Sequence, residues 1–156
     1  MSRFARPAGR PDFEIPGVVS LCWDPPLQTI VVTWLGTAQP SDFDALLGAE
    51  VQAMREHHAS RLLTDCRRQR PLPEDAQDRA DHESVPEALA AGLRRFAVVL
   101  PDDRDAAVNL EDRLGRIGRD HLQVGFFPTV EPAERWLARA LRSPSSRTRN
   151  PDSSIQ

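Results

Sequence analysis

Residues 28–35 are the segment of this chain that most restricts its fold. They form a run of β-branched and apolar side chains, which alternate between the two sides of a strand. One side carries Ile30, Val32 and Trp34, and the other carries Val31, Thr33 and Leu35. Because both sides are largely apolar, we expect the strand to be covered on both faces, or nearly so, as in a sheet packed against helices.

Strand-like and helix-like segments then follow one another along the chain. Strands are predicted at 18–23, 28–35, 62–64, 95–100 and 123–127. Helices are predicted from about 41 to 58, over 87–93, from about 102 to 117 and over 130–141, and Pro73 opens a further polar segment, 75–83. For the first helix, Ser41 is a natural N-cap, with Asp44 three residues later. This order predicts an α/β fold with a mixed sheet of about five strands and helices mainly on one face.

Composition excludes several classes of function. The chain has 156 residues and a net charge of -3, so nucleic acid is not an expected partner. Its 20 basic residues are all arginine, which excludes a Schiff-base lysine and a P-loop lysine. Cys22 and Cys66 form no C-x-x-C pair, and two cysteines favour a reducing cytosol over a disulfide framework.

The ends of the chain differ from its middle. Residues 1–16 contain arginines and prolines without periodicity, which predicts a flexible arm. Residues 143–156 are rich in Ser, Pro and Arg and predict a disordered tail, leaving 17–142 as one α/β domain. There is no signal-peptide core and no apolar run long enough to span a bilayer, so we expect a soluble, cytoplasmic protein.

The candidate site is the loop that follows the strand at 62–64. Partners and ligands of an open α/β sheet meet the carboxyl ends of its strands. This loop contains Asp65, Cys66, Arg67, Arg68 and Arg70. The guanidinium groups could bind carboxylate or phosphate, although a solvated loop neutralised by neighbouring acids is the favoured interpretation. For Asp65, hydrogen bonding to backbone N–H groups of the turn is favoured over a role as general base.

Cys66 is the best of a weak set of catalytic candidates, and we expect no enzymatic activity. Neighbouring arginines would lower its pKa if it were exposed, and His57 or His82 could approach it in space. However, no base or oxyanion site can be identified from the sequence, and free cysteine is usually a small buried apolar residue.

Two other groups of residues were considered as sites. Asp78 and His82 are four residues apart in a predicted helix, with Asp81 and Glu83 nearby, but a polar solvated surface explains them better than a metal site. Trp34 could line a cavity between sheet and helices, although core packing is the favoured interpretation. We therefore predict no metal and no cofactor.

The order of elements resembles the STAS-type fold, and in particular the small bacterial SpoIIAA-like proteins labelled STAS/SEC14-domain proteins. The similarity covers roughly residues 18–141. It rests on hydrophobic patterns, namely Val31-Val32-Thr33-Trp34-Leu35-Gly36, Leu62-Leu63-Thr64-Asp65, Arg95-Phe96-Ala97-Val98-Val99, Phe126-Phe127 and Glu131 through Trp136-Leu137.

The resemblance implies a regulatory or protein-interaction module, docking a protein partner or a second copy of itself at the loop after Asp65. In anti-sigma-factor antagonists of this family a serine after the third strand's aspartate is phosphorylated, and here that stretch holds no Ser or Thr. The alternative is a protein that binds a small anionic or lipid-like ligand between sheet and helices. A closed apolar pocket near Trp34 with arginines at its mouth would favour this alternative, whereas a filled core with a flat exposed patch would favour the module.

Overall fold

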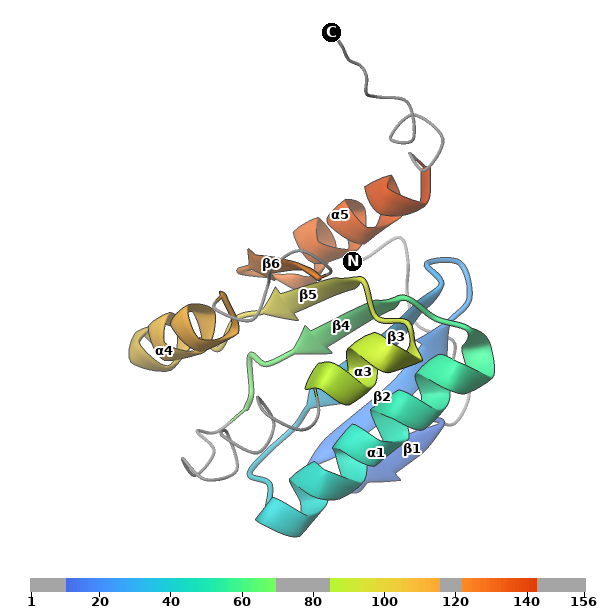
Figure 1. Cartoon of the computed structure of the whole chain (residues 1–156). Helices are drawn as coiled ribbons and strands as arrows, with labels where there is room; N and C mark the ends of the chain where they lie inside the picture. The colour runs from blue at the N-terminus through green and yellow to red at the C-terminus, as the bar shows by residue number, and fades with distance from the viewer. Residues whose placement is uncertain (1–10, 70–84, 116–121, 143–156) are drawn as a thin grey trace, which may run out of the picture.

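The computed structural model describes residues 11–69, 85–115 and 122–142, which form a six-stranded mixed sheet and four helices (Figure 1). The strands are β1 (Phe13–Ile15), β2 (Val19–Asp24), β3 (Thr29–Trp34), β4 (Arg61–Asp65), β5 (Arg95–Val99) and β6 (Gln123–Phe127). The helices are α1 (Pro40–His57), α3 (Val85–Ala91), α4 (Arg104–Gly115) and α5 (Val130–Arg142). The α/β class and the mixed sheet are confirmed, and each of the five predicted strand ranges overlaps an observed strand, but the sheet has six strands.

The expected number of strands was one too few, because β1 lies inside the range 1–16 that we predicted as a flexible arm. Phe13 pairs with Leu21 and Ile15 with Val19 in an antiparallel register. The strand has only three residues and stands at the edge of the sheet, so it has too few side chains for a periodic pattern to be recognised. Residues 1–10 and the predicted tail, 143–156, lie outside the described residues.

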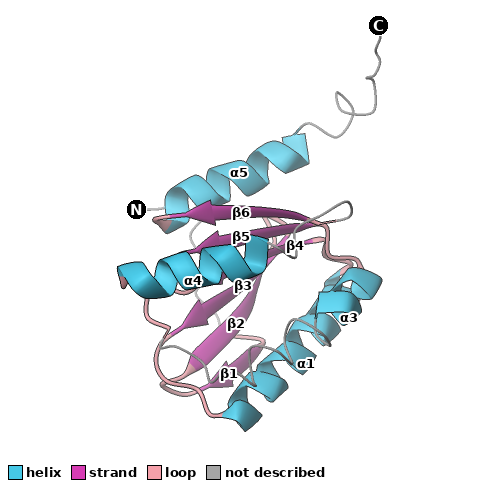
Figure 2. Ribbon diagram, turned by 60° about the vertical axis from the view of Figure 1, so that its left-hand side comes forward, coloured by secondary structure: helices cyan, strands magenta, loops and turns pink. Residues whose placement is uncertain are grey.

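The strands stand in the sheet in the same order as in the sequence. Strand β2 runs antiparallel to β1 and β3, and β3 to β6 are mutually parallel. Right-handed crossovers that always step in the same direction place their helices on the same face. Helices α1, α3 and α4 accordingly pack on one face, and α5, which follows β6, packs on the other (Figure 2).

Each face of the sheet has its own apolar core. On the face of α1, α3 and α4, side chains such as Val32, Leu62 and Val98 meet the helices. On the α5 face, the alternate residues Leu63 and Val99 meet Ala133 and Leu137. The alternation follows from the two-residue period of a strand, and it confirms that β3 is covered on both faces.

Helix α1 begins two residues earlier than the sequence predicted. Gln39 is its N-cap and Pro40 its first residue, a position where a missing N–H costs nothing. The Gln39 backbone N–H donates to Asp42 Oδ2 at 3.0 Å, so Asp42 takes the role that we expected of Asp44, and Ser41 lies inside the helix. The polar segment predicted at 75–83 lies outside the described residues.

A close backbone contact fixes the turn that follows β3. A Cβ atom on Gly36 would lie 2.7 Å from the Gly17 carbonyl oxygen, so only glycine fits there. The backbone N–H of Leu35 donates to the Val18 carbonyl at 2.7 Å. These contacts hold one edge of the cleft described below. None of the described helices is both long and apolar enough to cross a membrane.

Candidate functional site

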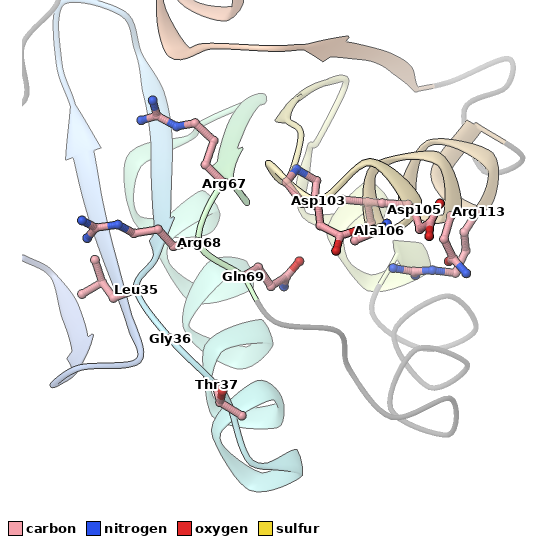
Figure 3. Close-up of a pocket in the computed structure, with 13 residues that line it drawn as sticks. Leu35, Gly36, Thr37, Arg67, Arg68, Gln69, Asp103, Asp105, Ala106 and Arg113 are labelled. Atoms are coloured by element: carbon pink, nitrogen blue, oxygen red, sulfur yellow. Dashed lines mark hydrogen bonds between the residues drawn. The ribbon is translucent and has the colours of Figure 1, made fainter.

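An open cleft of about 850 Å³ lies at the carboxyl ends of β3, β4 and β5 (Figure 3). Its walls come from the turn after β3, the loop after β4, and the loop and first turns of α4 after β5. The described residues that line it are Leu35, Gly36, Thr37, Arg67, Arg68, Gln69, Pro101, Asp103, Asp105, Ala106, Asn109, Leu110 and Arg113. The parallel arrangement thus creates a cleft where the sequence predicted a site, because it brings successive loops to one edge of the sheet.

The first part of the loop after β4 is held together by Asp65 and Arg67. Asp65 is 5% exposed, and its carboxylate accepts bonds from Arg67 Nε at 3.0 Å and from a terminal guanidinium nitrogen at 2.8 Å. The Arg67 backbone N–H also donates to Asp65, at 3.2 Å. The turn-stabilising role expected of Asp65 is confirmed, and Arg67 is engaged by the carboxylate two residues before it.

The remaining polar side chains of the cleft point in two directions. In Figure 3 the guanidinium groups of Arg67 and Arg68 extend away from α4, whereas Gln69 and Arg113 point toward one another. Asp103 is occupied with capping α4, since its Oδ1 accepts from the Ala106 N–H at 2.9 Å. Arg113 and Gln69 thus face one another across the cleft, whereas Arg70, which we predicted as part of the site, lies outside the described residues.

A second, largely apolar cavity of about 110 Å³ lies behind this polar pair, between the sheet and helices α1, α3 and α4. Its lining from the strands and the β4 loop is Trp34, Leu62, Thr64, Cys66, Gln69, Phe96, Leu122 and Val124. Its lining from the helices and adjoining turns is Phe43, Leu46, Leu47, Glu50, Val85, Ala88, Leu93, Leu110, Arg113 and Leu114. Gln69, Leu110 and Arg113 line both spaces, so the cavity meets the cleft at these three residues.

Trp34 lies beside an apolar cavity, as the hypothesis of a small bound ligand required. It is 3% exposed, its ring stacks on Phe43 of α1 with centroids 6.1 Å apart, and it lines the cavity. Core packing and cavity lining are thus both correct descriptions of this residue.

Glu50 of α1 is the unusual group in this cavity. Its side chain is half-buried among apolar neighbours, and within the described residues its carboxyl group has no hydrogen-bond or ion-pair partner. Burial raises its pKa from 4.5 to about 8, because removal from water disfavours the charged form. At neutral pH Glu50 is consequently mostly a neutral carboxylic acid that can donate one hydrogen bond and accept others.

Cys66 lines the same cavity, and its surroundings disfavour the thiolate form that a nucleophile needs. It is 3% exposed, with its Sγ 3.9 Å from Thr64 Oγ1. Burial raises the pKa of the Cys66 thiol to about 12. The interaction with the Thr64 hydroxyl has the next largest effect and lowers this pKa, the charges of Asp65 and Glu50 raise it, and the charge of Arg113 lowers it least. The pKa lowering that we considered for an exposed Cys66 does not apply, because burial outweighs the nearby arginines.

His57, the histidine that the sequence offered as a base for Cys66, is occupied elsewhere. Its ring stacks on Trp23 at 4.4 Å, and its Nε2 lies 3.5 Å from a carboxylate oxygen of Asp12. His82 and the other considered metal ligands, Asp78, Asp81 and Glu83, fall outside the described residues. Within residues 11–69, 85–115 and 122–142, no group of three or more His, Cys, Asp or Glu side chains could hold a metal ion.

Our sequence reasoning missed Glu50 and Arg113, although a signal was present. Glu50 falls at the next inward-facing position after Phe43, Leu46 and Leu47 in a helix with a 3.6-residue period. Arg113 likewise lies between Leu110 and Leu114 on the inner stripe of α4. A charged residue on an apolar stripe was the available indication of a polar group inside the core.

No family model matches this chain, and neither curated proteins nor solved structures include a significant match.

Proposed function

We propose that this protein binds a small amphipathic ligand whose apolar part occupies the cavity beside Trp34 and whose polar group lies near Arg113. One observation carries this proposal: an apolar cavity between sheet and helices meets an arginine-lined cleft at Gln69 and Arg113. Ligand sites combine apolar walls with a few convergent polar groups in this way.

The sizes of the two spaces support a small ligand. A cavity of about 150 Å³ lined by apolar side chains holds benzene, so a cavity of about 110 Å³ suits a smaller apolar group. A long acyl chain does not fit within it. Of the two ligand types considered from the sequence, a small anion with a short apolar part is therefore favoured over a lipid-like molecule.

A regulatory module is the second candidate, and the loop after β4 favours it. Cys66 and Gln69 line the inner cavity, while Arg67 and Arg68 line the outer cleft. Occupation of the cavity would thus act on the same loop, residues 66–69, that a protein partner or a second copy would contact at the surface. Membership of the STAS family, a bacterial origin and a cytoplasmic location remain predictions that rest on the sequence.

Native mass spectrometry of the protein purified from its own host tests the proposed function. We expect a small-molecule mass that is retained under gentle conditions and lost on denaturation. Ala88→Leu, which enlarges a side chain in the cavity wall, should abolish the added mass, whereas the same substitution at the exposed Ala45 of α1 should preserve it. A bare chain from its own host, or an added mass that persists in Ala88→Leu, would contradict binding in this cavity.

A further inference from the structure

The polar side chains of the inner cavity gather around Cys66. Cys66 lines the cavity together with Glu50 from α1 and Arg113 from α4, and Gln69 donates its backbone N–H to the Cys66 carbonyl at 3.1 Å. Thr64 adds its hydroxyl 3.9 Å from the sulfur. The cavity therefore has a polar end near the opening to the cleft.

The other walls of the cavity are apolar. Helix α3 contributes Ala88, strand β5 contributes Phe96 and strand β6 contributes Val124. Three ionisable groups of the described elements line the cavity: Glu50, Cys66 and Arg113. Asp65, the residue before Cys66, adds a charge that raises the pKa of its thiol. A bound molecule would thus meet one cation, one carboxyl group and one thiol at a single end, with hydrocarbon elsewhere.

We propose that this polar end binds the carboxylate of a short-chain monocarboxylic acid, held between the guanidinium of Arg113 and the carboxyl group of Glu50, with the alkyl chain beside Trp34. The proposal rests on the function proposed above and specifies its ligand class and its dependence on a proton.

The chemistry of each group favours this class. A guanidinium carries five N–H donors in a plane and can bind a carboxylate while keeping another partner. A neutral carboxylic acid can donate its proton to the second carboxylate oxygen, and such charge-assisted bonds are stronger than neutral ones. The Glu50 proton also removes the repulsion that two carboxylates would otherwise exert on one another.

The cavity volume limits the alkyl chain. Taking about 30 Å³ for each small group, as for a molecule of liquid water, a volume of about 110 Å³ accommodates about four non-hydrogen atoms. The propyl chain of butanoate fits this limit, with the carboxylate at the polar end beside the opening to the cleft, whereas the alkyl chain of tetradecanoate does not fit.

The proposal predicts how binding depends on pH. Burial raises the pKa of Glu50 to about 8, so the competent, protonated fraction falls from about nine-tenths at pH 7 to about one-tenth at pH 9. Butanoate should consequently bind about tenfold more weakly at pH 9 than at pH 7. In Glu50→Gln the amide donates at both pH values, so most of this difference should disappear.

Isothermal titration of the full-length protein with butanoate, butanamide and tetradecanoate tests the ligand class. We expect binding of butanoate at pH 7, at least tenfold weaker binding of butanamide, and no binding of tetradecanoate. Arg113→Gln should lower the affinity for butanoate at least tenfold and leave the affinity for butanamide nearly unchanged. A merely structural role of Arg113 would not produce this difference. The control Arg135→Gln removes an exposed arginine of α5 and should change the affinity for neither butanoate nor butanamide.

The outcomes separate this inference from the proposed function. Equal affinity for butanoate and butanamide would overturn the carboxylate class, and preferred binding of tetradecanoate would overturn the short chain. An unchanged tenfold pH effect in Glu50→Gln would overturn the role of its proton. If none of the three compounds binds while a ligand still co-purifies and is lost in Ala88→Leu, the ligand class is wrong and the cavity function stands. If no ligand co-purifies either, both proposals fail.

Discussion

The two faces of the sheet differ in how completely side chains fill the space beneath the helices. On the α5 face the apolar cluster consists of seven side chains that are at most 4% exposed, and α5 also buries Glu134 at 5% exposure; the apolar seven are Leu27, Val31, Leu63, Ala97, Val99, Ala133 and Leu137. The opposite face has the larger apolar cluster, yet it contains the cavity, Glu50 and Cys66. The same strands supply both faces, so the sheet itself does not cause the difference.

The difference lies in the helices and their connections. Helix α5 packs against β4, β5 and β6 with small and apolar side chains. The other face is covered by three separate helices, and α1 and α4 each turn a charged residue toward the space between them. Close packing is the rule in protein interiors, so the cavity with ionisable groups in its walls is the feature of the face of α1, α3 and α4 on which the proposed binding rests.

The largest expected effect concerns Glu50 and the pH dependence of stability. Between pH 4.5 and about 8 the folded protein holds a proton on Glu50 that the unfolded chain has released, so the free energy of unfolding falls as pH rises through this window. At about 1.4 kcal/mol for each pKa unit, the loss is on the order of 3–5 kcal/mol. Denaturant unfolding at several pH values should show a flatter profile for Glu50→Gln. If the two profiles are parallel, Glu50 is not desolvated.

Leu137→Ala tests the closely packed face. Leu137 is fully buried against the sheet, and its truncation should lower the free energy of unfolding by about 3 kcal/mol, because it removes apolar burial and leaves a cavity. Butanoate affinity at a temperature where the variant is folded should be unchanged. An affinity loss in the folded variant would show that the two faces are coupled.

Cys66 provides a kinetic test of the cavity face. In a Cys22→Ser background, iodoacetamide should modify Cys66 at least ~100-fold more slowly at pH 7.5 in the folded protein than in denaturant, because burial raises its pKa and blocks access. Mass spectrometry of quenched samples gives both rates. Rapid modification of the folded protein would instead indicate an exposed thiolate and renew the case for an enzyme.

The smallest expected effects distinguish the two loop arginines. Arg67→Ala leaves the buried Asp65 carboxylate without its guanidinium partner and should cost about 1–2 kcal/mol of unfolding free energy. Arg68→Ala, at an exposed neighbour in the same cleft, should cost less than about 0.5 kcal/mol. Thermal denaturation of the two variants side by side measures the difference. Equal losses of unfolding free energy in the two variants would mean that the bonds between Arg67 and Asp65 do not stabilise the fold.

Much of the fold could be predicted from the sequence because its signals are local. The alternating run over 28–35 and the helical spacing of residues such as Phe43 and Leu46 required no knowledge of the tertiary structure. Strand β1 could not be found in this way, since three residues gain their conformation from pairing with β2. The start of α1 was misplaced because Ser41 is the better cap by residue type, whereas Pro40 and Asp42 determined the actual start.

The site was only partly predictable, for a different reason. Asp65, Cys66, Arg67 and Arg68 could be placed at a strand end, and Trp34 on a cavity wall, from the order of elements. That Glu50 and Arg113 line the same cavity as Cys66 depends on how α1 and α4 are oriented on the sheet, which no spacing specifies. Desolvation is likewise a property of the packed structure, so the raised pKa values could not be inferred from residue types.

The sequential order of the strands has a consequence for how the chain folds. Every strand pairs with the strands next to it in the sequence, so no pairing has to wait for a distant part of the chain. The longest loop closure is then a single crossover, and the entropic cost of closure grows only slowly with loop length. A nucleus in any strand pair can grow outward one unit at a time, as in repeat proteins, and additional strand–helix units could be accommodated at an edge without rethreading the sheet.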